Sequence, residues 1–205
     1  MLIDLKYLKD KYKLKIKGII HVGAHTGEEY SIYRKLGIKK VVWIEALMSL
    51  AILLKGKFKK DKNNKVIWTT ISNKDGYADF YVTNNLASSS LFKLGTHQQH
   101  HPKIHYTDTK KVKTYTLDSL IEQYPIKITD YNMLNLDIQG AELMALQGMS
   151  KKLRHIKYIY TEVNTEKVYK KCCLMKEIDA YLTDFERVET KITKHGWGDA
   201  LYIRK

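Results

Sequence analysis

Residues 18–30 read GIIHVGAHTGEEY, and this stretch decides how the chain is expected to fold. Residues 18–22 are apolar around a single histidine, a pattern typical of a buried strand. Gly23 and Gly27 then permit a tight turn and a close approach of a ligand to the backbone. Glu28 and Glu29 follow at the start of a helix that is expected to end at Gly37. The stretch therefore predicts a strand, a glycine turn and a helix.

Short apolar runs alternate with helical patterns along most of the chain. Strands are predicted at residues 18–23, 40–46, 65–72, 76–83, 131–138, 156–163, 187–193 and 199–205. Helices are predicted at residues 28–37, 47–58, 116–124, 140–153 and 173–185, with Thr116 or Asp118 capping the third. Residues 76–83 are expected to form a hairpin with the preceding strand across residues 73–76. The polar stretch 84–111 is predicted to be a surface loop with room for one helical turn.

This alternation of strands and helices implies an α/β fold with a doubly wound, mostly parallel sheet. The last two strands are close enough across residues 194–198 to pair antiparallel, which is the ending of the Rossmann-like methyltransferase sheet. The length suits one domain over residues 1–205, with residues 1–17 as an N-terminal helical extension.

The formal net charge of +14 raises the question of an anionic partner. Nucleic acid, anionic membranes and acidic glycans are all attracted to a basic surface. The lysines are scattered, arginine is rare and no basic-aromatic stripe is evident, so a solvated surface is the favoured interpretation. Cys172 and Cys173 are adjacent and suit a reducing compartment. No signal peptide or membrane span is predicted, so we expect a soluble, cytoplasmic protein.

Ligands of such sheets bind at the carboxyl ends of the strands, which directs attention to Glu45. Glu45 ends the second strand 18 residues after Gly27, where a carboxylate can accept the hydroxyls of a ribose. The glycine turn lacks the G-x-G-x-x-G spacing of a dinucleotide site, and Glu28 and Glu29 would repel a pyrophosphate. A ligand that combines adenosine with a positively charged sulfonium fits both observations.

Acidic side chains also end later strands. Asp137 and Glu142 flank a glycine after one strand, and Glu162 and Asn164 end the next. Two carboxylates at neighbouring strand ends can share a metal, activate a hydroxyl or hold a sugar. The histidines of residues 97–105 suit a polar surface loop better than a metal site, and one of them is a candidate general base.

Eight stretches together resemble the FkbM family of S-adenosylmethionine-dependent methyltransferases. They are IIHVGAHTGEE, VVWIEA, ISNKDGYADFY, ASSSL, TLDSL, NMLNLDIQGAELMALQGM, YIYTEVN and GWGDALYI, in order from about residue 18 to the end. The resemblance implies S-adenosylmethionine as cofactor and O-methylation of sugars or other secondary metabolites. Many members read Lys-Ile-Asp-Val-Glu-Gly around Asp137, whereas this chain has Asn135 and Gln139 in place of the lysine and the glutamate.

The resemblance and the strand-end positions together give three sets of candidate site residues. The cofactor set is His21, Gly23, Ala24, His25, Thr26, Gly27, Glu28, Glu45, Ala46, Ile71, Ser72 and Asp137. The substrate set is Ser89, Ser90, Gln139, Glu142, Asn164 and Trp197. The catalytic set is Asp137, His97 and Glu162, with Asp137 the first choice and His97 the second choice as general base.

Three functions follow from these residues. The favoured one is an S-adenosylmethionine-dependent O-methyltransferase that acts on a hydroxyl of a sugar, a glycan or a small metabolite. The net charge of +14 keeps an RNA or other nucleic-acid methyltransferase as an alternative. The third is a non-catalytic binding protein on a methyltransferase fold, against which the intact glycine turn and Glu45 argue. A dehydrogenase is a more distant fourth possibility, because the glycine spacing does not match that of a dinucleotide site.

Overall fold

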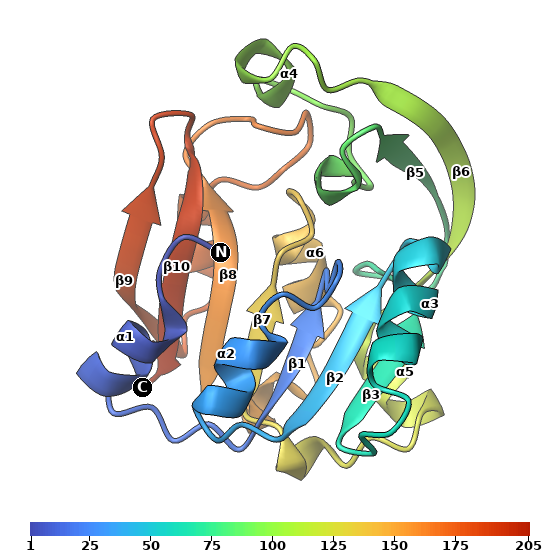
Figure 1. Ribbon diagram of the computed structural model, residues 1–205. Coiled ribbons are helices and arrows are strands. Elements are labelled where there is room, and N and C mark those ends of the chain that lie inside the picture. Colours follow the sequence, from blue (N-terminus) through green and yellow to red (C-terminus); the bar gives the residue numbers. More distant parts are fainter.

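A sheet of seven strands forms the centre of the computed structural model, which describes residues 1–205 (Figure 1). The strands are β1 (Gly18–Val22), β2 (Lys40–Glu45), β3 (Asn64–Trp68), β7 (Met133–Leu136), β8 (Tyr158–Asn164), β9 (Phe185–Ile192) and β10 (Trp197–Arg204). Their order is β3-β2-β1-β7-β8-β10-β9, and β10 alone runs in the direction opposite to the other strands. The predicted sheet, including its antiparallel C-terminal pair, is confirmed.

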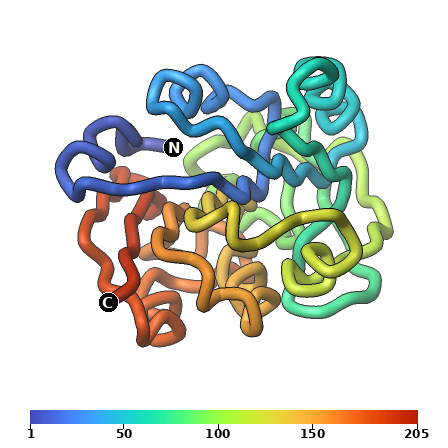
Figure 2. Tube along the Cα trace, turned by 90° about the horizontal axis from the view of Figure 1, so that it is seen from below, coloured from blue at the N-terminus to red at the C-terminus, as the bar shows by residue number.

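Helices cover both faces of this sheet, as the view from below in Figure 2 shows. They are α1 (Leu5–Lys11), α2 (Tyr30–Lys35), α3 (Met48–Lys57), α5 (Leu117–Gln123), α6 (Glu142–Gln147) and α7 (Met175–Tyr181). Leu8 of α1, Tyr33 of α2 and Leu54 of α3 belong to one apolar cluster, and the buried apolar side chains of α5, α6 and α7 belong to another. None of the helices is long and apolar enough to span a membrane.

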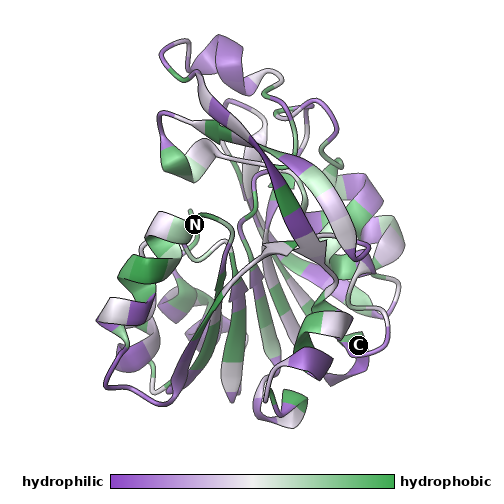
Figure 3. Ribbon diagram, turned by 90° about the vertical axis from the view of Figure 1, so that its right-hand side faces the viewer, coloured by the Kyte–Doolittle hydropathy of each residue, from purple (hydrophilic) through white to green (hydrophobic).

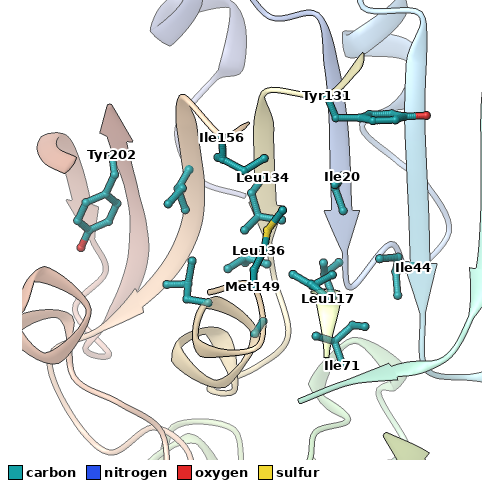
Figure 4. Packing of buried hydrophobic residues seen from close by; sticks show 14 of the residues in the cluster. Ile20, Ile44, Ile71, Leu117, Tyr131, Leu134, Leu136, Met149, Ile156 and Tyr202 are labelled. Atoms are coloured by element: carbon teal, nitrogen blue, oxygen red, sulfur yellow. The ribbon is translucent and has the colours of Figure 1, made fainter. Parts of the chain in front are cut away.

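The larger apolar cluster takes in apolar side chains from one face of the central strands (Figure 4). Ile20 of β1 and Leu134 and Leu136 of β7 pack there against Leu117 and Met149 from the α5–α6 side. β1 is buried at all five of its positions because helices cover both of its faces. Thr116, one of the two predicted caps, accepts a hydrogen bond from the amide of Ser119 at 3.0 Å and starts α5.

The third predicted strand is wrong in its extent, because residues 65–72 belong to two sheets. β3 ends at Trp68, and β4 (Thr70–Ile71) joins a second sheet with β5 (Gly76–Thr83) and β6 (Tyr106–Tyr115). The predicted hairpin across residues 73–76 is also wrong, since β4 and β5 both pair with β6 and not with each other. The apolar and β-branched pattern of residues 65–72 predicts extended backbone, but it cannot indicate that the two halves of the run pair with different strands.

β6 corrects the prediction of a loop at residues 84–111. Its sequence, YTDTKKVKTY, is exposed at most positions and therefore lacks the apolar alternation of a half-buried strand. The small sheet stands above the carboxyl ends of the main sheet and presents a largely hydrophilic outer face (Figure 3). The short helix α4 (His97–His100) is the one helical turn of this segment that was expected, beside a single 3₁₀ turn at Leu86–Ser88.

The N-terminal segment is helical only over α1, for which Asp4 accepts the capping hydrogen bond from Tyr7. The backbone amides of Leu2 and Ile3 donate to the buried carboxylate of Asp199 on β10. The segment therefore packs against the antiparallel end of the sheet.

Candidate functional site

A cavity of about 360 Å³ lies at the carboxyl ends of the parallel strands, beneath the β5–β6 segment. Its apolar wall comes from Leu47 and Leu50 at the start of α3, Phe80 of β5, and Leu86 and Leu91. The location is the one expected for a ligand site in an open parallel sheet. Nine candidate residues from the sequence line the cavity: Gly23, His25, Glu28, Glu45, Ala46, Ile71, Ser89, Asp137 and Gln139.

The glycine turn after β1 is held in a conformation that other residues adopt rarely. Gly23 has φ +85° and Gly27 has φ +68°. A Cβ atom at Gly23 would lie 1.8 Å from the carbonyl oxygen of Asp137, and one at Gly27 would lie 2.9 Å from Leu54. Gly23 thus allows the loop after β1 to touch the loop after β7, which brings two groups of cavity residues together.

Glu45 is fixed in place by the backbone around it. Its Oε2 accepts a hydrogen bond from the amide of His25 and its Oε1 accepts one from the amide of Leu47, both at 2.8 Å. Burial raises the pKa of this carboxyl, and the amide hydrogen bonds act in the opposite direction. Because each carboxylate oxygen has a further lone pair, Glu45 can still accept hydroxyl groups from a ligand.

The charged side chains that line the cavity are acidic, although the whole chain is strongly basic. They include Glu28, Glu29, Glu45 and Asp137, with His25 and the N-terminal amine of Met1 beside them, and no lysine or arginine side chain lines the cavity. This lining repels a pyrophosphate and attracts a sulfonium or ammonium group. The glycine turn, the Glu45 carboxylate that can accept the hydroxyls of a ribose, and the acidic lining together fit S-adenosylmethionine better than a dinucleotide.

Asp137 lies directly after β7, at the centre of the sheet. Its Oδ1 accepts a hydrogen bond from Nε2 of Gln139 at 2.8 Å. Burial raises the pKa of the carboxyl above its usual range, and the N-terminal amine of Met1, the Gln139 hydrogen bond and the nearby His21 partly oppose that shift. Asp137 is therefore an acidic group on the cavity wall whose proton affinity is increased.

The cofactor prediction for His21 is corrected, because its side chain lies in the core and not on the cavity wall. Its Nδ1 lies 3.2 Å from the hydroxyl of Tyr33, and its ring lies 5.1 Å from that of Trp43. Alternate residues of a strand face opposite sides, and His21 faces α2. Four further predicted cofactor residues support the turn or the strand ends without lining the cavity: Ala24, Thr26, Gly27 and Ser72.

Six predicted acceptor or catalytic residues also lie outside the cavity lining: Ser90, His97, Glu142, Glu162, Asn164 and Trp197. Glu142 accepts hydrogen bonds from the amides of Ile138 and Gly140 at 3.0 and 3.1 Å, and burial raises its pKa to about 7. His97 stacks on Tyr169 with ring centres 5.5 Å apart, and burial lowers its pKa to about 4. Both side chains support the loops around the site.

The apolar wall was not among the candidate residues. Leu47, Leu50, Phe80 and Val82 form a small cluster of their own under the β5–β6 segment. The only feature of the sequence that points to this wall is the apolar start of the helix after Glu45, and packing in the core explains that feature equally well. Glu29 was noted in the sequence as an acidic residue of the glycine turn but was not among the site candidates, and Thr70 was missed because nothing local distinguishes it from other strand residues.

The sequence and the fold both resemble known methyltransferases. The sequence matches the Methyltransferase FkbM domain over residues 21–196. The chain belongs to the FkbM methyltransferase family. It is therefore a methyltransferase whose cofactor is S-adenosylmethionine, and the lining of the cavity fits that cofactor. No curated protein matches the chain.

Solved structures share the fold of this family member at low sequence identity. A SAM dependent methyltransferase from Aquifex aeolicus is 13% identical with a TM-score of 0.53, and the match covers 100% of this chain and 91% of that one. The putative methyltransferase yhhF from Escherichia coli is 11% identical with a TM-score of 0.52, over 98% and 83% of the two chains. At such identities these structures support the fold and leave the acceptor open.

Proposed function

We propose that this FkbM-family methyltransferase methylates a hydroxyl group of a sugar, a glycan or a small metabolite, with Asp137 as the general base. The observation that carries the proposal is the position of Asp137 on the cavity wall, against the glycine turn. Gln139 occupies Oδ1 of this carboxylate, which leaves Oδ2 for a proton of the acceptor. Glu162 lies behind Gln139 and outside the lining, so it is the weaker candidate.

Methyl transfer to a hydroxyl needs a base that accepts the hydroxyl proton and an alignment of the acceptor oxygen with the methyl group. S-adenosylmethionine, when bound, supplies an electrophilic methyl group on a sulfonium. Asp137 accepts the proton of the hydroxyl as its oxygen attacks, and the raised pKa of the buried carboxyl makes it a better base than an exposed aspartate. The glycine turn and Glu45 hold the cofactor side of the cavity, so that the reacting atoms can meet at about 3 Å.

The acceptor is expected to enter between the loop after β7 and residues 86–91. Ser89 and Gln139 are the predicted substrate residues that line the cavity, and both are uncharged. The carboxylates nearby disfavour an anionic group at the reacting end of the acceptor. A neutral hydroxyl-bearing group fits this surrounding, whatever the charge of the rest of the acceptor.

The test is methyl transfer from labelled S-adenosylmethionine to a panel of mono- and disaccharides and small alcohols, with wild type, Asp137→Asn and the exposed control Asp79→Asn. We expect Asp137→Asn to lower kcat about 10²- to 10⁴-fold, the range for loss of a general base, with cofactor affinity changed by only a few fold. Asp79→Asn should match the wild type. Full turnover by Asp137→Asn would remove Asp137 as the base.

One surface favours a nucleic-acid acceptor as a second candidate. The antiparallel pairing of β5 and β6 places Tyr77, which is 68% exposed, opposite Lys113. Lys113 lies 4.7 Å from the ring centre of Tyr115, and Lys93 lies 5.5 Å from that of Tyr81. This basic-aromatic face combines residues of two strands and is not visible along the chain. Binding of single-stranded RNA that weakens steeply with salt would support this candidate.

A further inference from the structure

Gln139 is held in an unusual backbone conformation beside the site. Its φ is +56°, in the left-handed region that residues other than glycine, asparagine and aspartate rarely enter. Gly140, the next residue, has φ +100°. Such a conformation persists only where its surroundings hold it, and it concentrates at functional sites.

The contacts of Gln139 show what holds it. Its Nε2 donates to Oδ1 of Asp137 at 2.8 Å and to Oε2 of Glu162 at 3.0 Å. Its Oε1 accepts a hydrogen bond from the hydroxyl of Tyr169 at 2.7 Å, and its backbone carbonyl accepts one from Ser90 at 2.8 Å. Both amide hydrogens are therefore used on carboxylates, and the other two contacts reach the β8–α7 loop and the segment before α4.

We propose that Gln139 is a positioning residue, which orients Asp137 toward the cavity and at the same time attaches residues 84–105 over the cofactor site. The first part rests on the proposed role of Asp137, whereas the second does not. Leu86, Ala87, Ser89 and Leu91 of the attached segment line the cavity, so that a loosened segment weakens cofactor binding directly.

In this chain, where Asn135 stands in place of the lysine of many family members, an uncharged amide suits position 139 because ionisable groups surround it. They are the N-terminal amine of Met1, Asp137 after β7, Glu142 of α6, Glu162 of β8, Asp199 of β10, Tyr169 before α7, His97 of α4 and His21 of β1. A carboxamide links two carboxylates without adding charge. A carboxylate at position 139 would add a third negative group, and it could keep one of the two links only while it carries a proton.

The experiment compares wild type, Gln139→Glu and the exposed control Gln123→Glu by calorimetric titration with S-adenosylhomocysteine at pH 6.0 and 8.5. We expect Gln139→Glu to lose at least tenfold in affinity at pH 8.5 and less than threefold at pH 6.0, where the new side chain still donates. Gln123→Glu should match the wild type at both pH values. An equal loss at both pH values, or no loss, overturns the proposal.

Hydrogen exchange of residues 84–105 tests the attachment without any ligand or acceptor. We expect faster exchange in Gln139→Glu at pH 8.5 than in wild type, after correction for intrinsic rates, and unchanged exchange overturns the attachment. If Gln139→Glu does not fold, Gln139→Met keeps the size of the side chain and the direct bond between the Tyr169 hydroxyl and the carbonyl of Ser88, but removes the hydrogen bonds of the amide. Its exchange in the same segment then decides in the same way. A failed search for hydroxyl acceptors would contradict the proposed substrate class and leave these results standing.

Discussion

At the scale of single residues, the site depends on two positions that were recognisable for different reasons. Gly23 is recognisable because a glycine after a buried strand predicts a turn, and the structure adds that its missing side chain makes room for the carbonyl of Asp137. Glu45 is recognisable as a carboxylate at a strand end. The two amide hydrogen bonds that fix it are a property of the folded turn.

Gly23→Ala should abolish cofactor binding and destabilise the fold, because the new Cβ would lie 1.8 Å from a backbone oxygen that cannot easily move. Gly37→Ala is a matched control, since Gly37 has φ +77° and nothing lies within 4 Å of its Cβ position. We expect the control to lose about 1–2 kcal/mol from backbone strain alone. Urea unfolding and titration with S-adenosylhomocysteine measure both effects. Equal losses in the two variants would contradict the steric explanation.

At the scale of elements, α4 is attached to the rest of the molecule through histidines. The rings of His100 and His195 lie 4.3 Å apart, and His195 belongs to the turn between β9 and β10. His97 and His101 lie 4.7 Å apart within the helix and its end. Residues nearly 100 positions apart in sequence therefore form one cluster, which the histidine-rich stretch by itself did not indicate.

Acid should loosen this attachment. Burial and the neighbouring histidines lower the pKa of His97 to about 4, and the pKa of His195 is lowered by partial desolvation and by His100. A lowered histidine pKa means that the folded state resists protonation, so its stabilising contribution is complete above about pH 6.5 and is lost as the pH falls toward 4. We expect lower protection factors in residues 97–101 at pH 5 than at pH 7.5, after correction for intrinsic exchange rates, with a smaller change in His195→Gln. Equal protection at both pH values would contradict this.

At the scale of the whole molecule, acid acts on buried groups in both directions. His21 makes the folded state less stable as the pH falls, whereas the raised pKa of Glu142 acts in the opposite direction. His21 is fully buried beside Tyr33, and burial lowers its pKa to about 4. The unfolded chain binds a proton near pH 6.5, so unfolding is favoured as the pH falls through this window. The difference amounts to about 2 kcal/mol at pH 5 relative to pH 7.5.

Urea unfolding of wild type, His21→Gln and the exposed control His105→Gln at pH 5 and 7.5 measures this contribution. Glutamine can still bond the Tyr33 hydroxyl and does not titrate. The free energy of unfolding at pH 5 relative to pH 7.5 should therefore be about 2 kcal/mol higher in His21→Gln than in wild type, and His105→Gln should match the wild type. A wild-type pH dependence in His21→Gln would assign the acid sensitivity to other groups.

The sequence by itself determined the α/β class, the seven strands of the main sheet and the turn that leads into the cofactor site. These features depend on local periodicity and on glycines and carboxylates at strand ends, which the chain displays directly. Only the tertiary structure decided that β4 and β6 pair, that His21 faces the core and that Gln139 connects Asp137, Glu162 and residues 84–105. Each of these depends on contacts between distant segments, and a pattern of neighbouring residues carries no information about which distant side chain will supply the partner.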